Sequence, residues 1–355
     1  MRTDIPSPSF VIRSDRLEEN LNRLSYLESK TGVQILHTLK SFSSKEGLDL
    51  IGRRLSGFSL GNMQEYQKID TVEYSHIHSY APYFYPQEID DIARLSDTIS
   101  FNSLNQYREH QKSISKLSSI GIRINPKLTI KQPRYCNPNY SMRLGVEYRR
   151  FLEVIESEPK LFDSLGGLHF HALCSQGLGA LKYLLSHIEK NYTHILPRLK
   201  WLNLGGGHQL AHTTYDSSGF ISTINSFRDR YPHLDIYFEP GESITKDIGY
   251  LSATILDIIP SSTPVVILDI SIEVHLLDIA ITKQKPTIRD TTSPKSGHHY
   301  LLTGISCIAG DIIGDYYFKQ PLKIGDRIRF EDMIGYTIVK QTQFNGIKSA
   351  SLVFD

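Results

Sequence analysis

Eight short apolar runs alternate with longer amphipathic stretches along most of this chain, and this alternation most constrains its fold. The amphipathic stretches repeat apolar residues at intervals of three and four, as helices packed on one face do, for example in residues 104 to 117, 149 to 159 and 222 to 231. Eight βα units predict an α/β fold, a closed (β/α)₈ barrel of parallel strands over residues 14 to 241. The expected strands are residues 33 to 39, 56 to 60, 75 to 79, 98 to 101, 121 to 125, 165 to 170, 201 to 204 and 235 to 239.

After residue 242 the pattern changes to strand-like runs separated by turns. These runs indicate a C-terminal antiparallel β-sandwich or β-barrel domain over residues 242 to 355, which residues 1 to 13 would join. The polar residues 283 to 298 are expected to form a loop between two of its strands. The expected strands are residues 250 to 259, 263 to 271, 299 to 306, 326 to 333 and 335 to 346.

The composition is that of an ordinary globular protein, with 40% hydrophobic and 22% charged residues. With 39 basic against 38 acidic residues, the chain has no net field that would attract nucleic acid or a membrane surface. Cys136, Cys174 and Cys307 are too few and too scattered for a disulfide framework, and their spacing matches no zinc site, so no metal is expected. A reducing cytoplasm fits these features.

In a barrel of this kind the chemistry gathers where the strands end, and Lys40 follows the first run in QILHTLKSFS. Most lysines are solvated surface residues, and Lys40 taken alone would be one of them. At the barrel mouth, partial desolvation would lower its pKa and free the amine to form a Schiff base with an aldehyde.

Three other strand ends carry suggestive residues. The glycines of NLGGGHQ, Gly205, Gly206 and Gly207, let backbone N–H groups converge on a phosphate, although a tight βα turn is an equal alternative. His171 could stack on a flat aromatic ring or be an ordinary core histidine. Glu239 could pair with a protonated ring nitrogen or serve as a turn residue. Together with a reactive lysine, these features describe a pyridoxal 5′-phosphate (PLP) site.

Longer strings point the same way over nearly the whole chain. They include HTLKSF, IHSYAPYF, LHFHALC, WLNLGGGH, FEPGE, CIAGDIIGDYYF and DMIGYTIVKQTQFNGI. The chain resembles the fold-type III PLP decarboxylases of the alanine racemase and ornithine decarboxylase superfamily. More narrowly, it resembles the carboxynorspermidine/carboxyspermidine decarboxylases.

The resemblance implies a role for each matching residue. Lys40 would hold the cofactor covalently, His171 would lie against one face of its ring, and Glu239 would keep the ring nitrogen protonated. The other cofactor contacts implied are Gly205, Gly206, Gly207, Gly241 and, from the C-terminal domain, Tyr336.

In this superfamily the segment matching SCIAGD reaches into the partner subunit's site, so the resemblance implies a homodimer with shared active sites. Cys307 and Asp311 would then act in catalysis across the interface, with Cys307 or Lys40 returning a proton to the substrate. As alternatives, Cys307 could be a buried small hydrophobe and Asp311 a turn residue. The acids available for a cationic substrate tail are Glu242, Glu273, Asp311 and Asp315.

The implied reaction is decarboxylation of carboxynorspermidine or carboxyspermidine to norspermidine or spermidine, in polyamine biosynthesis. Residues 272 to 286 depart from the family pattern, which leaves open a decarboxylase for another basic amino acid, such as ornithine, lysine or diaminopimelate. A PLP carrier without turnover would lack the C-terminal domain, and a racemase would need a second base for which no tyrosine lies in a matching motif.

Overall fold

The computed structural model of the chain describes residues 5 to 132, 143 to 294 and 296 to 355. Its internal contacts divide the chain into two compact units. One unit comprises Glu19–Ile244, and the other combines Met1–Glu18 with Thr245–Asp355. Cys136 lies outside the described residues, and Cys174 is disulfide-bonded, so the expectation of reduced cysteines is wrong for Cys174.

Eight strands of the first unit close into a ring. Their order is β5-β4-β3-β2-β10-β9-β8-β6, and pairing of β5 with β6 completes the circle. Every pair in the ring is parallel. The eight predicted runs all coincide with these strands, so the predicted barrel is confirmed. The bounds are β2 Gln34–Thr38, β3 Gly57–Leu60, β4 His76–Tyr80, β5 Thr98–Phe101, β6 Ser119–Asn125, β8 Gly167–His169, β9 Trp201–Asn203 and β10 Asp235–Phe238, with β7 Val146–Glu147 added beside β6.

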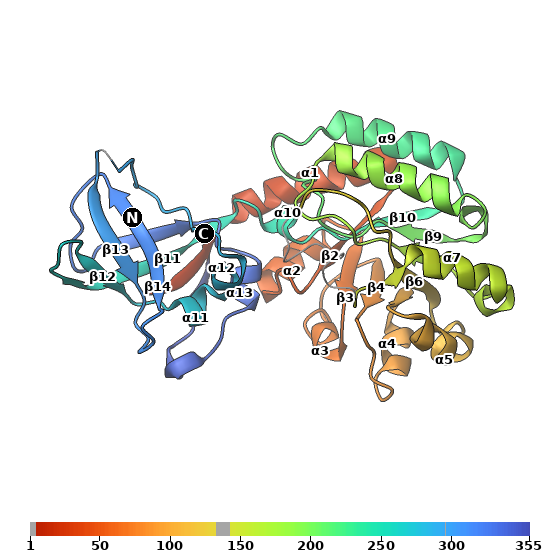
Figure 1. Cartoon of the computed structure of the whole chain (residues 1–355), viewed down its shortest axis with the longest axis horizontal. Coiled ribbons are helices and arrows are strands. Elements are labelled where there is room, and N and C mark those ends of the chain that lie inside the picture. The colour runs from red at the N-terminus through yellow and green to blue at the C-terminus, as the bar shows by residue number, and fades with distance from the viewer. Residues whose placement is uncertain (1–4, 133–142, 295) are drawn as a thin grey trace. The chain divides into compact units, whose positions relative to one another are not determined.

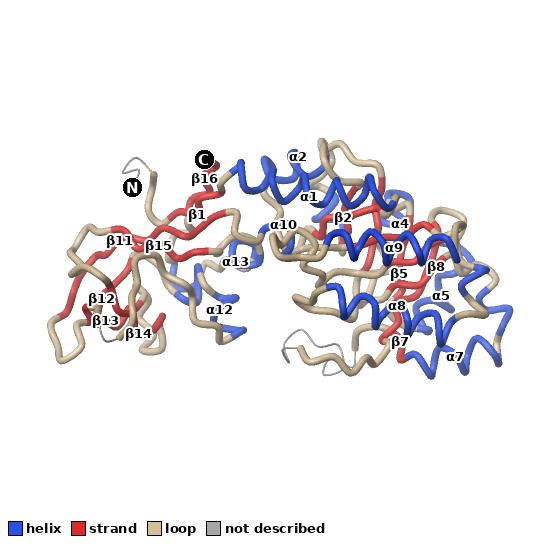
Figure 2. Tube along the Cα trace, turned by 90° about the horizontal axis from the view of Figure 1, so that it is seen from above, coloured by secondary structure: helices blue, strands red, loops and turns tan. Residues whose placement is uncertain are grey.

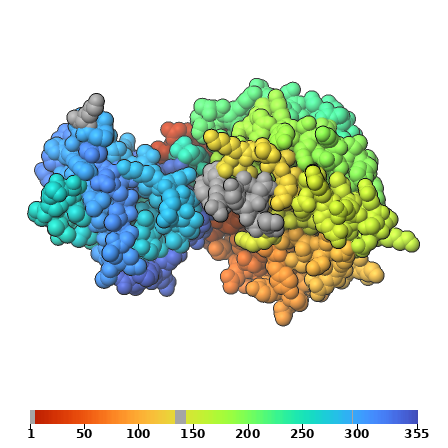
Figure 3. Space-filling model, viewed as in Figure 1, coloured from red at the N-terminus to blue at the C-terminus, as the bar shows by residue number. Residues whose placement is uncertain are grey.

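Helices follow the strands and lie outside the ring (Figure 1). Several begin where a polar side chain accepts a backbone N–H of the first turn, as expected for helix starts. These capping residues are Ser44, Asn62, Ser103 and Asp216. In the space-filling view α8 and α9 form the green part of the barrel surface and the early βα units the orange part (Figure 3). The bounds are α1 Ser14–Thr31, α2 Lys45–Gly52, α3 Met63–Tyr66, α4 Ile89–Leu95, α5 Leu104–Ile114, α7 Tyr148–Ser157, α8 Leu178–Tyr192, α9 Ser217–Arg230 and α10 Glu242–Thr245, with 3₁₀ turns at Pro159–Phe162 and Leu196–Arg198.

A single indole fills part of the ring's interior. Trp201 on β9 is 2% exposed and packs with Leu36 and Tyr237. A Cβ at Gly167 on β8 would lie 2.0 Å from this indole, and one at Gly121 on β6 would lie 2.3 Å from it. The two glycines therefore leave the space that the tryptophan occupies. Its side chain fills this part of the barrel interior, so a ligand can bind only at the ends of the strands.

The second unit is built on one mixed sheet with the order β14-β13-β12-β11-β1-β16, in which β15 also pairs with β11 (Figure 2). Most pairs are antiparallel, as predicted, but β1 pairs with β16 and β12 with β13 in parallel. The bounds are β1 Ser9–Ile12, β11 Gly249–Ile259, β12 Val265–Leu268, β13 His298–Thr303, β14 Ile312–Phe318, β15 Arg327–Glu331 and β16 Ser351–Phe354.

The strand predicted over residues 335 to 346 is wrong. This segment forms helix α13 Tyr336–Val339 and a 3₁₀ turn at Phe344–Gly346. Gly335 enters the helix with φ 91°, a conformation that interrupts an extended chain. The divergent segment contains two further short helices, α11 Ile272–His275 and α12 Leu277–Thr282. Short apolar runs do not distinguish helix from strand by periodicity, which explains the error at residues 335 to 346.

Among the described residues, no helix has both the length and the apolarity that crossing a membrane requires.

Candidate active site

The barrel unit gathers four of the predicted site features at one edge of the ring, where its strands end. Lys40 follows β2, His171 follows β8, the three glycines follow β9, and Glu239 follows β10. Since all eight strands are parallel, these residues share the C-terminal edge, where barrels of this kind hold their functional groups.

Lys40 is a reactive amine in a crowded setting. Its side chain is exposed, so a ligand can reach it, yet the surrounding protein removes much of the hydration of an ammonium. This desolvation lowers the pKa of Lys40 from its ordinary value; Glu239 opposes the shift and Arg123 adds to it. A larger fraction of the amine is then neutral and nucleophilic.

Glu239 is a buried carboxylate, 4% exposed, in the same region. Its Oε1 accepts a hydrogen bond of 2.8 Å from Nδ2 of Asn203. Nε2 of His78 lies 3.8 Å from Oε1, and Nε2 of His169 lies 3.4 Å from Oε2. An acid held in this way is suited to binding a cationic ring nitrogen.

The three glycines are required by their surroundings. A Cβ at Gly205 would lie 2.7 Å from the backbone of His171, and one at Gly207 would lie 2.0 Å from the carbonyl of Leu173. Both residues also have positive φ, of 67° and 82°. The Gly205 N–H donates to Oδ1 of Asn203 at 2.8 Å. The backbone therefore forms a tight turn at the end of β9, and the phosphate contact of these glycines stays a prediction.

His171 is half-buried beside this turn. The Gly206 N–H donates to its Nδ1 at 3.3 Å, which leaves the proton of the neutral ring on Nε2. Burial, followed by the nearby charges of Lys40 and Arg123, lowers the pKa of His171 well below its ordinary value. A neutral imidazole with a fixed orientation is suited to packing against a flat ring.

Gly241 directly precedes the short helix α10, which begins at Glu242. A Cβ at Gly241 would lie 2.8 Å from the side chain of Ser41, next to Lys40, so no larger residue fits there without rearrangement. Glu242 is exposed and accepts a hydrogen bond of 2.7 Å from Oγ of Ser175. Its carboxylate lies at the same edge of the ring and is open to a cationic ligand.

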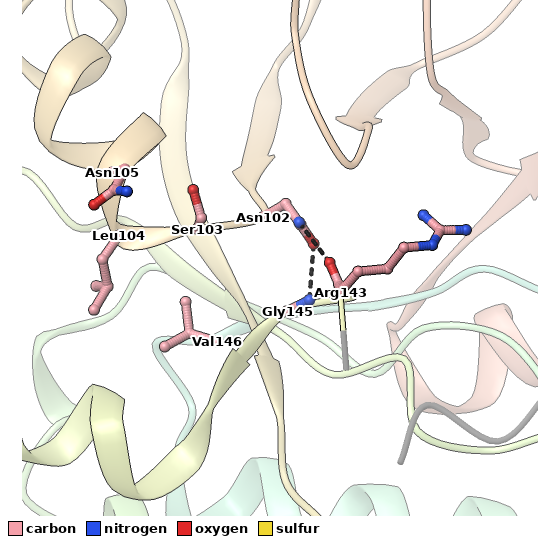
Figure 4. Close-up of a pocket in the computed structure, with 7 residues that line it drawn as sticks. All are labelled: Asn102, Ser103, Leu104, Asn105, Arg143, Gly145 and Val146. Atoms are coloured by element: carbon pink, nitrogen blue, oxygen red, sulfur yellow. Dashed lines mark hydrogen bonds between the residues drawn. The ribbon is translucent and has the colours of Figure 1, made fainter. Parts of the chain in front are cut away.

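Asn102, at the end of β5, lines a hollow of about 260 Å³ (Figure 4). Its amide holds the wall: Oδ1 accepts from Tyr80 Oη and from the Gly145 N–H, both at 2.7 Å, and Nδ2 donates to the Arg143 carbonyl at 2.8 Å. In Figure 4 the Arg143 guanidinium extends away from this amide. The other lining residues are Ser103, Leu104, Asn105 and Val146.

The other unit carries Cys307 on an exposed loop between β13 and β14. Cys307 is an exposed free thiol. Large apolar side chains surround it in sequence: Ile305, Ile308 and Ile312 are 44%, 43% and 46% exposed. An exposed apolar loop of this kind is typical of a surface that binds another protein.

Asp311, at the end of this loop, is 3% exposed, and backbone donors occupy both of its oxygens. The N–H of Ile272 donates to Oδ1 at 2.8 Å, and the N–H of Ser306 donates to Oδ2 at 2.9 Å. The carboxylate therefore ties the Cys307 loop to the start of α11. These contacts favour a structural part for Asp311 in addition to the catalytic part predicted.

The remaining predicted residues of this unit have local partners. Glu273 accepts from Ser271 Oγ at 2.9 Å at the start of α11. Asp315 is exposed on β14 and pairs with Nε2 of His299 at 2.9 Å. Tyr336 is half-buried at the start of α13.

Sequence reasoning missed four residues at the barrel mouth, namely His78, Arg123, His169 and Asn203. Arg123 is 5% exposed, and its guanidinium lies 4.5 Å from the centre of the Tyr80 ring. The signal for the histidines was present in HIH and HFH, because alternate residues of a strand face the same side.

Comparison with known proteins identifies the family. Residues 24 to 334 match the family model described as pyridoxal-dependent decarboxylase, C-terminal sheet domain. The chain belongs to the pyridoxal-dependent decarboxylases. It is therefore a PLP-dependent enzyme, as the sequence predicted.

Two relatives and one solved structure similar to this decarboxylase carry more specific names. It is 34% identical to the carboxynorspermidine/carboxyspermidine decarboxylase of Campylobacter jejuni, over 98% of this chain and 93% of that protein. It is 35% identical to the carboxyaminopropylagmatine decarboxylase of Synechocystis sp., over 97% and 89%. The crystal structure of carboxynorspermidine decarboxylase from Campylobacter jejuni, complexed with norspermidine, superposes with a TM-score of 0.89 at 33% identity, covering 99% of this chain and 94% of that one.

The residues of the barrel fit PLP. An accessible amine, a backbone turn with no room for side chains and a buried carboxylate match the aldehyde, phosphate and ring nitrogen of the cofactor. Within the described residues, both ring nitrogens of His169 are buried without a hydrogen-bond partner, which leaves polar atoms available inside the barrel.

Proposed function

We propose that this decarboxylase removes the α-carboxyl group of a carboxylated polyamine, carboxynorspermidine or carboxyspermidine, to give norspermidine or spermidine. The observation that carries the proposal is the full-length similarity to decarboxylases named for these substrates. A specific observation also favours a second candidate, since the relative with 35% identity is named for carboxyaminopropylagmatine. All of these names describe a carboxylated amine with a long cationic tail.

The barrel residues would bind and orient the cofactor. Lys40 would hold it covalently, His171 would pack against its ring, and Glu239 would bind its ring nitrogen. Gly205, Gly206, Gly207 and Gly241, with Tyr336 of the second unit, would hold the remainder. When bound, PLP supplies the electron sink that accepts the electron pair left as CO₂ departs.

The protein's own groups complete the reaction. Either the thiol of Cys307 or the amine of Lys40 would return a proton to the substrate's Cα. The cationic tail would be held by carboxylates, for which we propose Glu242, Glu273, Asp311 and Asp315. Asp311 would in addition fix the Cys307 loop through its two backbone hydrogen bonds.

We further propose a homodimer whose subunits share their active sites, working in the cytoplasm. The exposed isoleucines around Cys307 support the dimer, because a second copy of the chain would cover them. An exposed free thiol is best preserved in a reducing compartment.

We also propose residues 14 to 241 as the PLP-binding domain, and residues 242 to 355, joined by 1 to 13, as the β domain.

The test is CO₂ release by the purified, PLP-loaded protein. Carboxynorspermidine, carboxyspermidine, carboxyaminopropylagmatine, ornithine, lysine and diaminopimelate are offered in parallel at equal concentration. We expect turnover of a carboxylated polyamine with kcat/KM at least tenfold above that of ornithine, lysine or diaminopimelate. Preference for carboxyaminopropylagmatine would select the second candidate, and turnover of a simple amino acid alone would contradict both.

A further inference from the structure

The carboxylate of Glu239 has two unequal oxygens. Oε1 accepts a close hydrogen bond from Asn203, at 2.8 Å. Among the described residues, the atom recorded nearest to Oε2 is Nε2 of His169, at 3.4 Å. The second oxygen is thus positioned to receive a donor from His169.

His169 is a buried imidazole whose two nitrogens have no hydrogen-bond partner within the described part of the chain. Three rings fix its orientation by edge contacts. The ring centres of His78 and Tyr80 each lie 5.3 Å from it, and that of His171 lies 6.3 Å from it. A buried polar group without a partner is costly, and Glu239 is the acceptor that one of its nitrogens faces.

The surroundings keep this imidazole neutral. Burial, followed by the charges of its neighbours, lowers the pKa of His169 well below its ordinary value. A neutral ring carries one N–H, and a proton on Nε2 would lie on the nitrogen that is 3.4 Å from Oε2 of Glu239. The titratable and charged groups that face His169 are His78 and Tyr80 on β4, Arg123 on β6, His171 beyond β8, Lys40 beyond β2 and Glu239 beyond β10.

The same cluster has the composition of a metal site, since ligand atoms of His78, His169 and Glu239 lie within 4.8 Å of one another. Two observations argue against a metal. Lys40 and Arg123 both act on His169 as positive charges, and a divalent cation would be repelled by them. His78 also uses both ring nitrogens, with Thr98 at 2.7 Å and Ser100 at 3.1 Å.

We infer that His169 is a positioning residue for Glu239. The Nε2–H of His169 would donate to Oε2 of Glu239, and this donor would keep the proton of the acid–pyridine pair on the ring nitrogen of PLP. The inference rests on the proposed role of Glu239 as the partner of that nitrogen. In a buried site, an ion pair of carboxylate and pyridinium competes with a neutral pair in which the acid keeps the proton. Donors to the carboxylate stabilise the ion pair, and Asn203 and His169 would supply one for each oxygen.

Two substitutions of His169 distinguish the effect of its N–H donor from the effect of its ring packing. His169→Phe keeps a flat ring and removes the donor, whereas His169→Gln keeps an amide N–H at about the reach of Nε2. Each holoenzyme is loaded with PLP labelled with nitrogen-15 in the pyridine ring, and the nitrogen chemical shift is recorded along with the Kd for PLP. His76→Phe is the matched control, because His76 is also buried in the barrel but bonds to Thr98 and stacks on Tyr237.

We expect His169→Phe to move the nitrogen shift toward that of an unprotonated pyridine, with the ion-pair equilibrium changed about tenfold or more. His169→Gln should restore most of the natural shift, and His76→Phe should leave it unchanged. An unchanged shift in His169→Phe would overturn the inference, and so would equal changes in the Phe and Gln variants, which would assign the effect to packing. If Glu239→Gln also leaves the shift unchanged, the proposed partner of the ring nitrogen is wrong; if only the His169 variants are silent, the role of Glu239 stands and this inference alone fails.

Discussion

Replacing Asp311 separates two roles for this carboxylate. The sequence resemblance assigns it to the substrate or the catalytic apparatus, whereas its observed contacts join the Cys307 loop to the start of α11. Both oxygens are occupied by backbone donors, at 2.8 and 2.9 Å, and the side chain is 3% exposed.

The expected loss of stability follows from these two bonds. A hydrogen bond to a charged group contributes about 1.5–3 kcal/mol, and the donors on Ile272 and Ser306 belong to half-buried residues, so the lower end applies. Asp311→Ala should therefore lower the free energy of unfolding by about 3 kcal/mol. Asp311→Asn keeps one acceptor oxygen and the same shape, so it should lose about half of this, or roughly 1.5 kcal/mol.

The measurement is urea unfolding followed by circular dichroism, with kcat and KM determined on the same preparations. Asp315→Ala is the matched control in the same segment. Asp315 is exposed and pairs only at the surface with His299, so its removal should change the free energy of unfolding by less than about 1 kcal/mol.

A different result would refute this reasoning. If Asp311→Asn unfolds like the natural protein but loses kcat/KM by about a hundredfold or more, the carboxylate acts on the substrate itself. If instead both Asp311 variants lose stability in the expected ratio, and Asp311→Asn keeps KM within about threefold, the carboxylate acts by holding the loop.

Two further predictions address the dimer and the buried histidines. Inactive Lys40→Ala and Cys307→Ala subunits, when mixed and allowed to exchange, should recover part of the activity through hybrid dimers, and no recovery would contradict shared sites. Burial lowers the pKa of His37, His78 and His208 from 6.5 to about 4 in the folded protein, so the unfolded chain binds more protons between these values. Stability should thus be complete above about pH 6.5 and fall as the pH is lowered, by about 1.4 kcal/mol for each histidine at pH 5.5. Urea midpoints at pH 8 and pH 5.5 measure this loss, and equal midpoints would contradict it.

The barrel could be predicted because its signals are local and repeated. Each strand is a short apolar run bounded by turns, and each helix carries its own periodicity and cap, so the eight units were recognisable one at a time. The sheet of the other unit was harder, because its pairings join distant segments. Strand β1 at the start of the chain pairs with β11 and with β16 near the end, and nothing in the sequence of Ser9–Ile12 specifies those partners.

For the site, residue type and position at a strand end were enough to select Lys40, His171 and Glu239, since a parallel barrel brings its strand ends together. The sequence also determined the glycine run, whose residue type alone permits the close approach of the backbone. It could not show that backbone donors occupy both oxygens of Asp311, because the Ile272 N–H comes from a residue 39 positions away along the chain.

The tertiary structure alone decided which groups surround the acid at the mouth. His169 and Asn203 lie on neighbouring strands, opposite each other in register, and Glu239 follows the next strand. Their separation along the chain is large, and the distances that make them one cluster come from the closure of the ring. The sequence determines which chemical groups are present. The fold determines which side chains lie side by side, and therefore the desolvation and contacts that shift their pKa values.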